Sequence, residues 1–427
     1  MGVVGGMCIQ IAAVGRQNVH LNSNPDMTLF KSNHKRYTNF AEDFEENDFS
    51  AGTVGFGQKV SATISRYGDL VSDLFLEVTL PAIQASATAA YWVNAIGFAL
   101  IQDIQVEIGG TEVDQLYPEW LFFWEEMTQR PGARLGEQIG KFSYSADVEE
   151  DMMEFASKPR QLYVPLPFWF NKYFLEKGLS IPLIALTYHE IKVKVTFRPL
   201  AQCAAIPMNS ASGSPLVASD MDAKLLVSYV YLDADERQAY AAIEHEFLIT
   251  TTQRQVHAIT SSGAASEQIK IYFNHPSNCL AWFVRPTDWM TQRRRFSVGH
   301  MDLFDFSLKE HSDLSVWGDA VDPVRHASLT LNGHDRWPSN LPGMFFRTVQ
   351  PTMKWPNSPE GYLYVFSFSA MGGAWQPTST LNLSRIDHVQ LELKYGANIG
   401  TSDVFIFAES YNLLVVREGM GGVRYSN

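Results

Sequence analysis

The sequence is poor in cysteine and in long hydrophobic runs, and each shortage excludes a class of protein. The only cysteines are Cys8, Cys203 and Cys279, and no two of them form a CxxC pair. An odd and scattered set of this kind is not a disulfide framework, so we expect a protein kept in reducing conditions. No apolar run approaches the roughly 20 residues of a membrane span. Residues 1–15 lack the basic start of a signal peptide, so none is predicted there.

Charge is also scarce, and its balance is acidic. Charged residues make up 19% of the chain and the formal net charge is -13, which argues against nucleic acid as the main partner. Hydrophobic residues reach 46% and aromatic residues 13%. This composition leaves two interpretations open: a protein that buries surface against other copies, or a large β protein that needs few charges. A chain of 427 residues has room for two domains.

Signatures of catalysis and of bound cofactors are missing as well. The sequence contains no HExxH, no GxSxG, no P-loop and no complete GxGxxG. The glycine-rich stretch at Gly52, Gly55 and Gly57 indicates a flexible turn. Arg293-Arg-Arg295 is the strongest basic run, and three residues favour a solvated loop or an ion pair between subunits over phosphate binding.

The histidines are scattered, although histidine clusters would be needed for a cupin-like metal enzyme. His189-Glu190 and Glu244-His245-Glu246 place a histidine directly beside an acid. Adjacent residues of a strand point to opposite faces, so a structural role is favoured over a shared metal. A structural role is also favoured for the glycosylation sequon Asn382-Leu-Ser384. We therefore predict no enzyme activity and no catalytic, cofactor-binding or metal-binding residues.

Short alternating segments dominate what the sequence does contain. Ile191, Val193, Val195 and Phe197 alternate with polar residues, which is the period of a strand with one buried face. Only two helices are predicted, over 114–128 and from about Asp233. Further strands are predicted at 58–66, 72–80, 99–108, 160–168, 224–232, 268–274, 279–285, 324–331, 361–369, 389–395 and 402–416.

The order of these segments is repeated once along the chain. Val106–Ile108 runs into Gly109-Gly110, and Leu329–Leu331 runs into Asn332-Gly333; both dipeptides are typical of hairpins. The segments 162–166 and 191–197 then correspond to 362–366 and 389–395. The first copy is longer by about 25 residues, an insertion that we place in surface loops within 128–157. The repeat predicts two copies of one domain.

The fold class predicted from this pattern is all-β, with two consecutive sandwiches or barrels and a few short helices. The first domain is expected at 25–200 and the second at 223–427. The Ala-, Ser-, Pro- and Met-rich segment 201–222 is expected to link them. Residues 1–24 are either an N-terminal arm that serves assembly or a strand that closes the first domain.

The residues themselves resemble a known family, the major capsid proteins of nucleocytoplasmic large DNA viruses such as chlorella viruses and iridoviruses. The matching motifs run in order along nearly the whole chain. They are Gln10–Leu21, Asn24-Pro25, Phe30-Lys31, Tyr37–Phe40, Leu166–Asn171, Pro182–Leu186, Tyr188–Glu190, Tyr231–Asp233, Asp235–Arg237, Asn382–Asp387, Gly419–Gly422 and Tyr425–Asn427. Tyr173–Lys177 departs from the family by being slightly longer, which puts the conformation of that loop in doubt.

The resemblance implies two eight-stranded jelly rolls, a homotrimeric pseudo-hexagonal capsomer and an icosahedral shell around an internal membrane. The implied partners are the chain itself, first as a trimer and then through lateral contacts between trimers, and minor capsid proteins. Contact with the membrane would be indirect, and assembly would take place in the host cytoplasm. The rival functions are a minor capsid paralogue of the same fold and a carbohydrate-binding β-sandwich protein, which would need an exposed aromatic platform.

Overall fold

The computed structural model divides the chain into two compact units, Met1–Asn39 and Phe40–Asn427. It describes residues 4–26, 28–32, 34–84, 91–129, 135–142, 148–173, 176–205, 217–218, 220–259, 266–287, 303–304, 306, 322–338, 341–359, 361–396, 399 and 401–425. The regular elements in the described part of the first unit are the helices α1 (Val4–Ala12), η1 (Arg16–Asn18) and α2 (Val19–Asn22). Residues 34–39 carry no regular structure and lead into the first strand.

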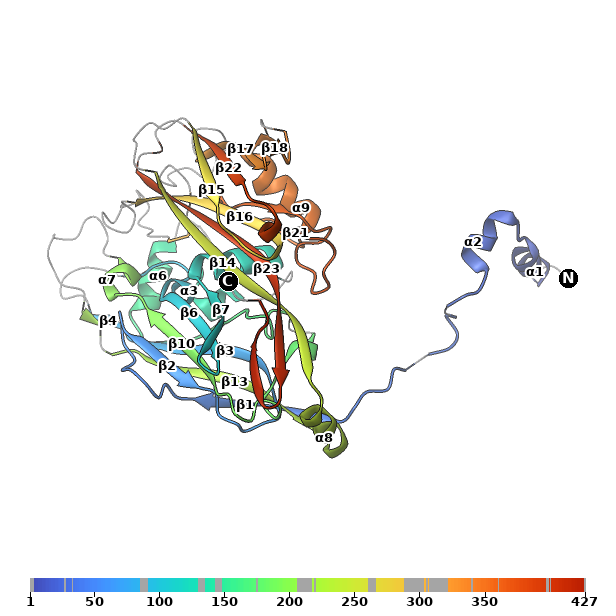
Figure 1. Ribbon diagram of the computed structural model, residues 1–427, viewed down its shortest axis with the longest axis horizontal. Helices are drawn as coiled ribbons and strands as arrows, with labels where there is room; N and C mark the ends of the chain where they lie inside the picture. Colours follow the sequence, from blue (N-terminus) through green and yellow to red (C-terminus); the bar gives the residue numbers. More distant parts are fainter. Residues whose placement is uncertain are drawn as a thin grey trace. The chain divides into compact units, whose positions relative to one another are not determined.

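The first half of the larger unit is built from two antiparallel sheets (Figure 1). One has the order β1 (Phe40–Asn47), β13 (Asp222–Leu232), β3 (Leu70–Leu80) and β8 (Arg160–Pro165), with β9 (Ile181–Pro182) also paired to β3. The other has the order β2 (Lys59–Thr63), β10 (Ile191–Phe197), β6 (Ile101–Ile108) and β7 (Thr111–Leu116). Burial alternates strictly along β10, so one face of its sheet packs on the core, as the alternating sequence predicts.

The second half repeats this arrangement with its own pair of sheets. One has the order β14 (His245–Ile259), β23 (Ser402–Arg417), β16 (Pro276–Pro286) and β20 (Tyr364–Ser367), with β21 (Leu381–Asn382) on β16 and β24 (Met420–Val423) on β23. The other has the order β15 (Ser266–Ile271), β22 (Val389–Tyr395), β17 (Val324–Leu331) and β18 (His334–Asp335), with β19 (Leu341–Pro342) on β17.

Both halves follow one chain path. We number eight principal strands in each half in chain order: β1, β2, β3, β6, β7, β8, β10 and β13 in the first half, and β14, β15, β16, β17, β18, β20, β22 and β23 in the second. In each half, the first, eighth, third and sixth of these strands form one sheet, and the second, seventh, fourth and fifth form the other. This path defines a jelly roll, so the all-β prediction with two jelly rolls is confirmed. The predicted correspondence of the strands around Ile191 and Val389 is confirmed as well, because β10 and β22 are both the seventh strand.

The two hairpin turns confirm the repeat at the level of single residues. Ile108 pairs with Thr111 across Gly109-Gly110, and Leu331 pairs with His334 across Asn332-Gly333. All four turn residues have positive φ, between 48° and 84°. A two-residue turn of this kind matches the twist of its strands, which explains the choice of Gly and Asn.

The strand pairing corrects the expected start of the second domain at residue 223. β13 pairs with β1 and β3, so residues 222–232 form the eighth strand of the first jelly roll. The described parts of the expected linker 201–222 also belong to the first half, since β11 (Ala204–Ala205) pairs with β5 (Tyr91–Trp92) and β12 (Val217–Ala218) with β4 (Ile83–Gln84). The connection between the halves is α8 (Ala234–Ala242), capped by Asp233.

The remaining helices lie in the connections between the strands. The predicted helix over 114–128 is shorter than expected: α4 (Pro118–Thr128) starts at Pro118, and 114–116 belong to β7. The insertion placed within 128–157 contains α5 (Leu135–Ile139) and α6 (Val148–Ala156), whose buried Ile139 and Met152 pack on the core. The others are α3 (Ile96–Ala99), η2 (Lys177–Leu179), α7 (Leu200–Cys203), the π-helical turn η4 (Phe345–Val349), α9 (Gln350–Lys354) and η5 (Leu383–Arg385). No helix in the described ranges is long and apolar enough to cross a membrane.

Candidate functional site: the junction of the two jelly rolls and the exposed surfaces

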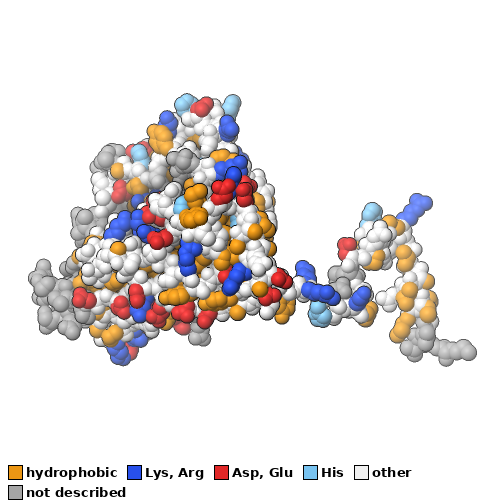
Figure 2. All heavy atoms as spheres, turned by 60° about the horizontal axis from the view of Figure 1, so that its bottom comes forward, with side chains coloured by type: hydrophobic (Ala, Val, Ile, Leu, Met, Phe, Trp, Pro, Cys, Tyr) orange, Lys and Arg blue, Asp and Glu red, His pale blue; other side chains and the backbone are white. Residues whose placement is uncertain are grey.

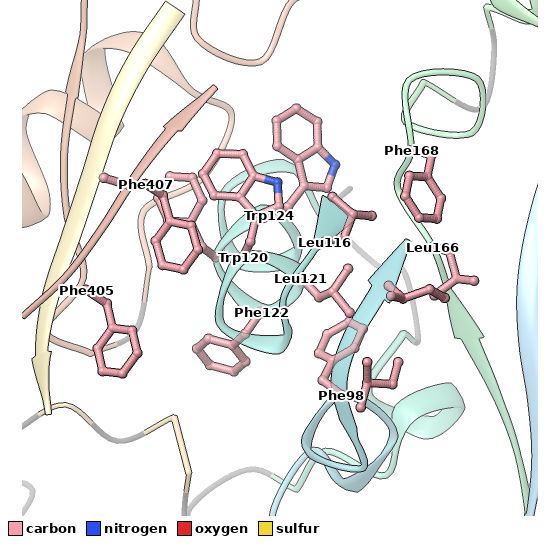
Figure 3. Packing of buried hydrophobic residues seen from close by; sticks show 14 of the residues in the cluster. Phe98, Leu116, Trp120, Leu121, Phe122, Trp124, Leu166, Phe168, Phe405 and Phe407 are labelled. Atoms are coloured by element: carbon pink, nitrogen blue, oxygen red, sulfur yellow. The ribbon is translucent and has the colours of Figure 1, made fainter. Parts of the chain in front are cut away.

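The two jelly rolls meet around α4, which is buried along almost its whole length. From Pro118 to Met127 every residue of this helix is buried. Figure 3 shows Trp120 of α4 facing Phe407 of β23, and the two ring centroids lie 5.8 Å apart. Phe122 stacks on Phe304 at 4.6 Å. A helix of the first half therefore supplies core to the second, so the two halves share one apolar interior.

Buried ion pairs cross the same junction. Glu119 of α4 binds Arg285 of β16 at 2.9 Å and lies 3.6 Å from Arg198, which follows β10. All three side chains are less than a tenth exposed. Burial alone raises the pKa of Glu119, but the two guanidinium groups outweigh burial and hold that pKa below its usual value. The carboxylate is therefore ionised and joins both halves.

A second ion pair lies deeper in the junction. The Lys172 ammonium binds the Glu409 carboxylate, and both side chains are at most 3% exposed. Asn278 donates to the other oxygen of Glu409 at 2.8 Å, and the ammonium lies 3.9 Å from the ring centroid of Trp124. Lys172 follows β8 in the first half, whereas Glu409 belongs to β23 in the second. Each charge therefore has partners inside the protein, as burial requires.

Asp114 forms a further link from β7 to β14. Its Oδ1 accepts the backbone N–H of Thr252 at 2.9 Å and that of Gln115 at 3.0 Å. Burial raises the pKa of Asp114 to about 7, although both N–H groups favour the ionised form. This carboxylate thus changes its charge near neutral pH within the contact between the halves.

The histidines singled out in the sequence hold backbone segments together. His189 accepts the N–H of Gly421 on its Nδ1 at 3.1 Å, which ties the first half to β24 of the second. His245 lies with its Nε2 2.7 Å from the carbonyl oxygen of Tyr240 and stacks on the rings of Tyr240 and Phe247. No group of three potential metal ligands occurs in the part of the chain that the structure describes.

The other motifs singled out in the sequence have local structural positions. Asn382 caps η5 by accepting the N–H of Ser384 at 3.1 Å, and Ser384 Oγ accepts the N–H of His275 at 2.6 Å. Gly57 lies in a turn with φ of +75°, as expected for the glycine-rich stretch. The Arg293–Arg295 run lies outside the described residues. Cys8 is exposed, whereas Cys203 and Cys279 are buried, and all three are free.

Exposed apolar side chains are concentrated in a few places. Figure 2 shows hydrophobic and basic side chains exposed along the N-terminal segment. In the second half, Met344, Met353, Met371 and Trp375 are 40% to 66% exposed around η4, α9 and the loop after β20. On β1, Phe40 and Phe44 are about half exposed. The sequence did not predict the surfaces around Met344 and β1, since exposure depends on which neighbours the fold supplies.

Comparison with family models assigns both halves to viral capsid proteins. Residues 28–233 match the N-terminal domain of major capsid proteins, and residues 236–422 match the major capsid protein of large eukaryotic DNA viruses. The division between the two matches falls beside α8, in agreement with the strand pairing. The fold and the comparisons thus define the class: a double jelly-roll capsid protein.

Individual relatives show the same likeness over the full chain. The major capsid protein of Pyramimonas orientalis virus is 33% identical over 99% of this chain and 100% of its own. That of Paramecium bursaria Chlorella virus 1 is 30% identical over all of both chains. A chain in the quasi-atomic model of the capsid of this chlorella virus has a TM-score of 0.78 at 28% identity, covering 94% of this chain and 100% of its own. The Faustovirus major capsid protein shares the fold, with a TM-score of 0.74 at 12% identity over 96% and 97% of the two chains. The chain belongs to the major capsid protein family of the large eukaryotic DNA viruses.

Proposed function

We propose that this capsid protein acts as a homotrimer that tiles an icosahedral shell as a pseudo-hexagonal capsomer. The observation that supports the proposal is the repeated jelly roll. Each chain carries two lobes with one strand order, and a cyclic trimer of such chains has six similar lobes. The buried charges and aromatic rings of the junction hold the two lobes in one fixed relation, which a regular tile requires.

Light scattering combined with size exclusion tests the trimer. A chain of 48.0 kDa should elute as a particle of three times that mass at micromolar concentration. The interface between subunits should bury about 2,000 Å² or more, which is typical of obligate oligomers. A stable monomer at micromolar concentration would contradict the proposal.

The proposed location is the virion shell, after assembly in the host cytoplasm. The three free thiols, two of them buried, support folding under reducing conditions. Because the full-length relatives are named capsid proteins, the shell is favoured over carbohydrate binding. A role as a minor capsid paralogue differs only in copy number, so quantitative mass spectrometry of purified particles separates the two.

Minor capsid proteins are the further partners that we propose, and the N-terminal segment is the contact that we assign to them or to a neighbouring trimer. Its described residues include three short helices, and the side chains of Met7, Ile9, Ile11 and Val14 are exposed. Such apolar groups gain stability only when a partner covers them. Deletion of residues 1–15 should leave trimers with an unchanged melting temperature that fail to build shells. A truncated chain that cannot fold would show instead that the segment belongs to the core.

A further inference from the structure

Strand β1 is an edge strand with an unusual degree of exposure. It pairs only with β13 among the described strands, so no described strand covers its other side, and the Phe44 N–H donates to Asp43 Oδ1 at 2.9 Å. Seven of its eight residues are exposed, from Phe40 to Glu46, and only Asn47 is buried. Phe40 and Phe44 lie on one face and are about half exposed. Such an edge is a template for pairing with another chain.

The charges of β1 restrict which chain can pair with it. Its sequence carries four carboxylates and no basic residue, and one more carboxylate follows at position 48. Lys224 binds Glu46 at 2.8 Å, while no ion pair to the other carboxylates occurs in the described structure. Two β1 strands placed edge to edge would repel each other, since like charges on opposing strands are destabilising. The carboxylates are Glu42, Asp43, Glu45, Glu46 and Asp48.

The segment just before β1 has the complementary charge. The segment between residues 16 and 39 contains one acidic residue, Asp26, and four described basic residues, namely Arg16, Lys31, Lys35 and Arg36. Residues 34–39 form no helix and pair with no strand in the described part of the chain, so another strand can pair with their backbone groups. If residues 34–39 folded back onto β1 of the same chain, the hairpin would need a tight turn, and tight turns favour Gly and Pro. Residues 34–39 contain neither.

We propose that residues 34–39 of one copy add as a strand to the free edge of β1 in a second copy. Main-chain hydrogen bonds would supply the pairing, and Lys35 and Arg36 beside Glu42 and Glu45 would select the partner. This contact rests on the proposed assembly function and deepens it. It names the segment that pairs with the edge of β1, and it links copies through an exchange of residues 34–39.

Hydrogen–deuterium exchange on the full-length protein provides the direct readout. When copies associate, the amides of 34–39 should exchange at least tenfold more slowly than in dilute protein, and so should the outward amides of β1. The Lys35→Glu/Arg36→Glu variant should lose this protection. The matched control is Arg325→Glu/Arg385→Glu, which makes the same change of charge at two exposed arginines of the second jelly roll and should keep the protection.

Mixing two variants distinguishes exchange between copies from folding back within one chain. Glu42→Lys/Glu45→Lys should also lose protection when alone. In a mixture with Lys35→Glu/Arg36→Glu, the basic residues 34–39 of the first variant meet the acidic β1 of the second, and the acidic residues 34–39 of the second meet the basic β1 of the first. Protection should therefore return in the chains of both variants. Protection that is independent of concentration, or that does not return in the mixture, would overturn the proposal. Particles of trimeric mass with unprotected 34–39 would overturn the strand exchange alone, whereas a protein that stays monomeric would overturn the proposed function as well.

Discussion

The charged side chains between the two jelly rolls depend on one another, so the loss of one destabilises the protein. Loss of Glu119 would leave Arg198 and Arg285 buried side by side without their carboxylate. Breaking a buried pair in this way costs about 3–5 kcal/mol. Because Glu119 comes from one lobe and Arg285 from the other, the effect should fall on the contact between the lobes.

We therefore expect Glu119→Ala to lower the free energy of unfolding by about 3–5 kcal/mol in urea titrations. The control is Glu154→Ala, which removes an exposed pair with Lys158 and should cost about 0–1 kcal/mol. Equal effects of the two substitutions would show that the buried cluster does not hold the lobes together.

Asp114 gives the junction a dependence on pH with a definite sign. Its pKa in the folded protein is about 7, above the ordinary value of 3.8. The unfolded chain therefore loses this proton first, and the contribution of Asp114 to stability falls as pH rises from about 4 to 7. Above pH 7 the penalty is constant, and below pH 4 it is absent.

Asp114→Asn should remove this dependence, because an amide oxygen still accepts the N–H groups of Gln115 and Thr252 without carrying charge. The variant should become progressively more stable than the wild type between pH 4 and 7, by an amount on the order of a few kcal/mol. Urea unfolding at a series of pH values measures the difference. A constant difference across that range would mean that Asp114 does not titrate there.

Among the elements, the two equivalent hairpins depend most directly on backbone conformation. Gly110 and Gly333 have φ values of +83° and +84°, and open space surrounds the position of a Cβ at each. A substitution there meets only the cost of the left-handed backbone, about 1–2 kcal/mol.

Gly110→Ala and Gly333→Ala should therefore each lower the free energy of unfolding by about 1–2 kcal/mol. Gly178→Ala is the matched control, since Gly178 also lies in open space but without a positive φ, and we expect a change close to zero. If the two hairpin variants match the control, the turns tolerate other conformations.

Helices and strands differed in how well the sequence predicted them. Val324–Leu331 was predicted with its observed bounds because its residues alternate and a turn follows. β1 was not predicted, since nearly all of its residues are exposed and no apolar face marks it. β14 was also missed. The helix expected from 114 begins at Pro118, because the hairpin pairing of β6 extends β7 through Leu116.

At the scale of the whole molecule, net charge opposes the packing of many copies. Three copies of a chain with a net charge of -13 carry a formal charge of -39. Exposed charges repel over about 10 Å at 0.1 M salt and over shorter distances in stronger salt. Neighbouring capsomers of the proposed trimeric kind would thus need screening, basic contacts or a bridging partner.

We expect lateral association of trimers to strengthen as ionic strength rises from about 0.01 M to 0.5 M, where screening shortens the range of repulsion. Sedimentation velocity at a fixed trimer concentration measures it. The same titration with Lys270→Ala serves as a control for small changes of charge. If the association does not change with ionic strength, long-range repulsion does not govern assembly.

The sequence by itself determined the all-β class, the duplication and the two glycine-containing turns, because alternation and turn chemistry are local properties. Its motifs also identified the family. Only the tertiary structure decided that residues 222–232 return to the first jelly roll, since a strand's partners are set by which edge is open and not by its own pattern. The same holds for the junction. Glu119 and Arg285, or Lys172 and Glu409, lie far apart in the sequence, and only the packing of α4 between the lobes brings these charges together.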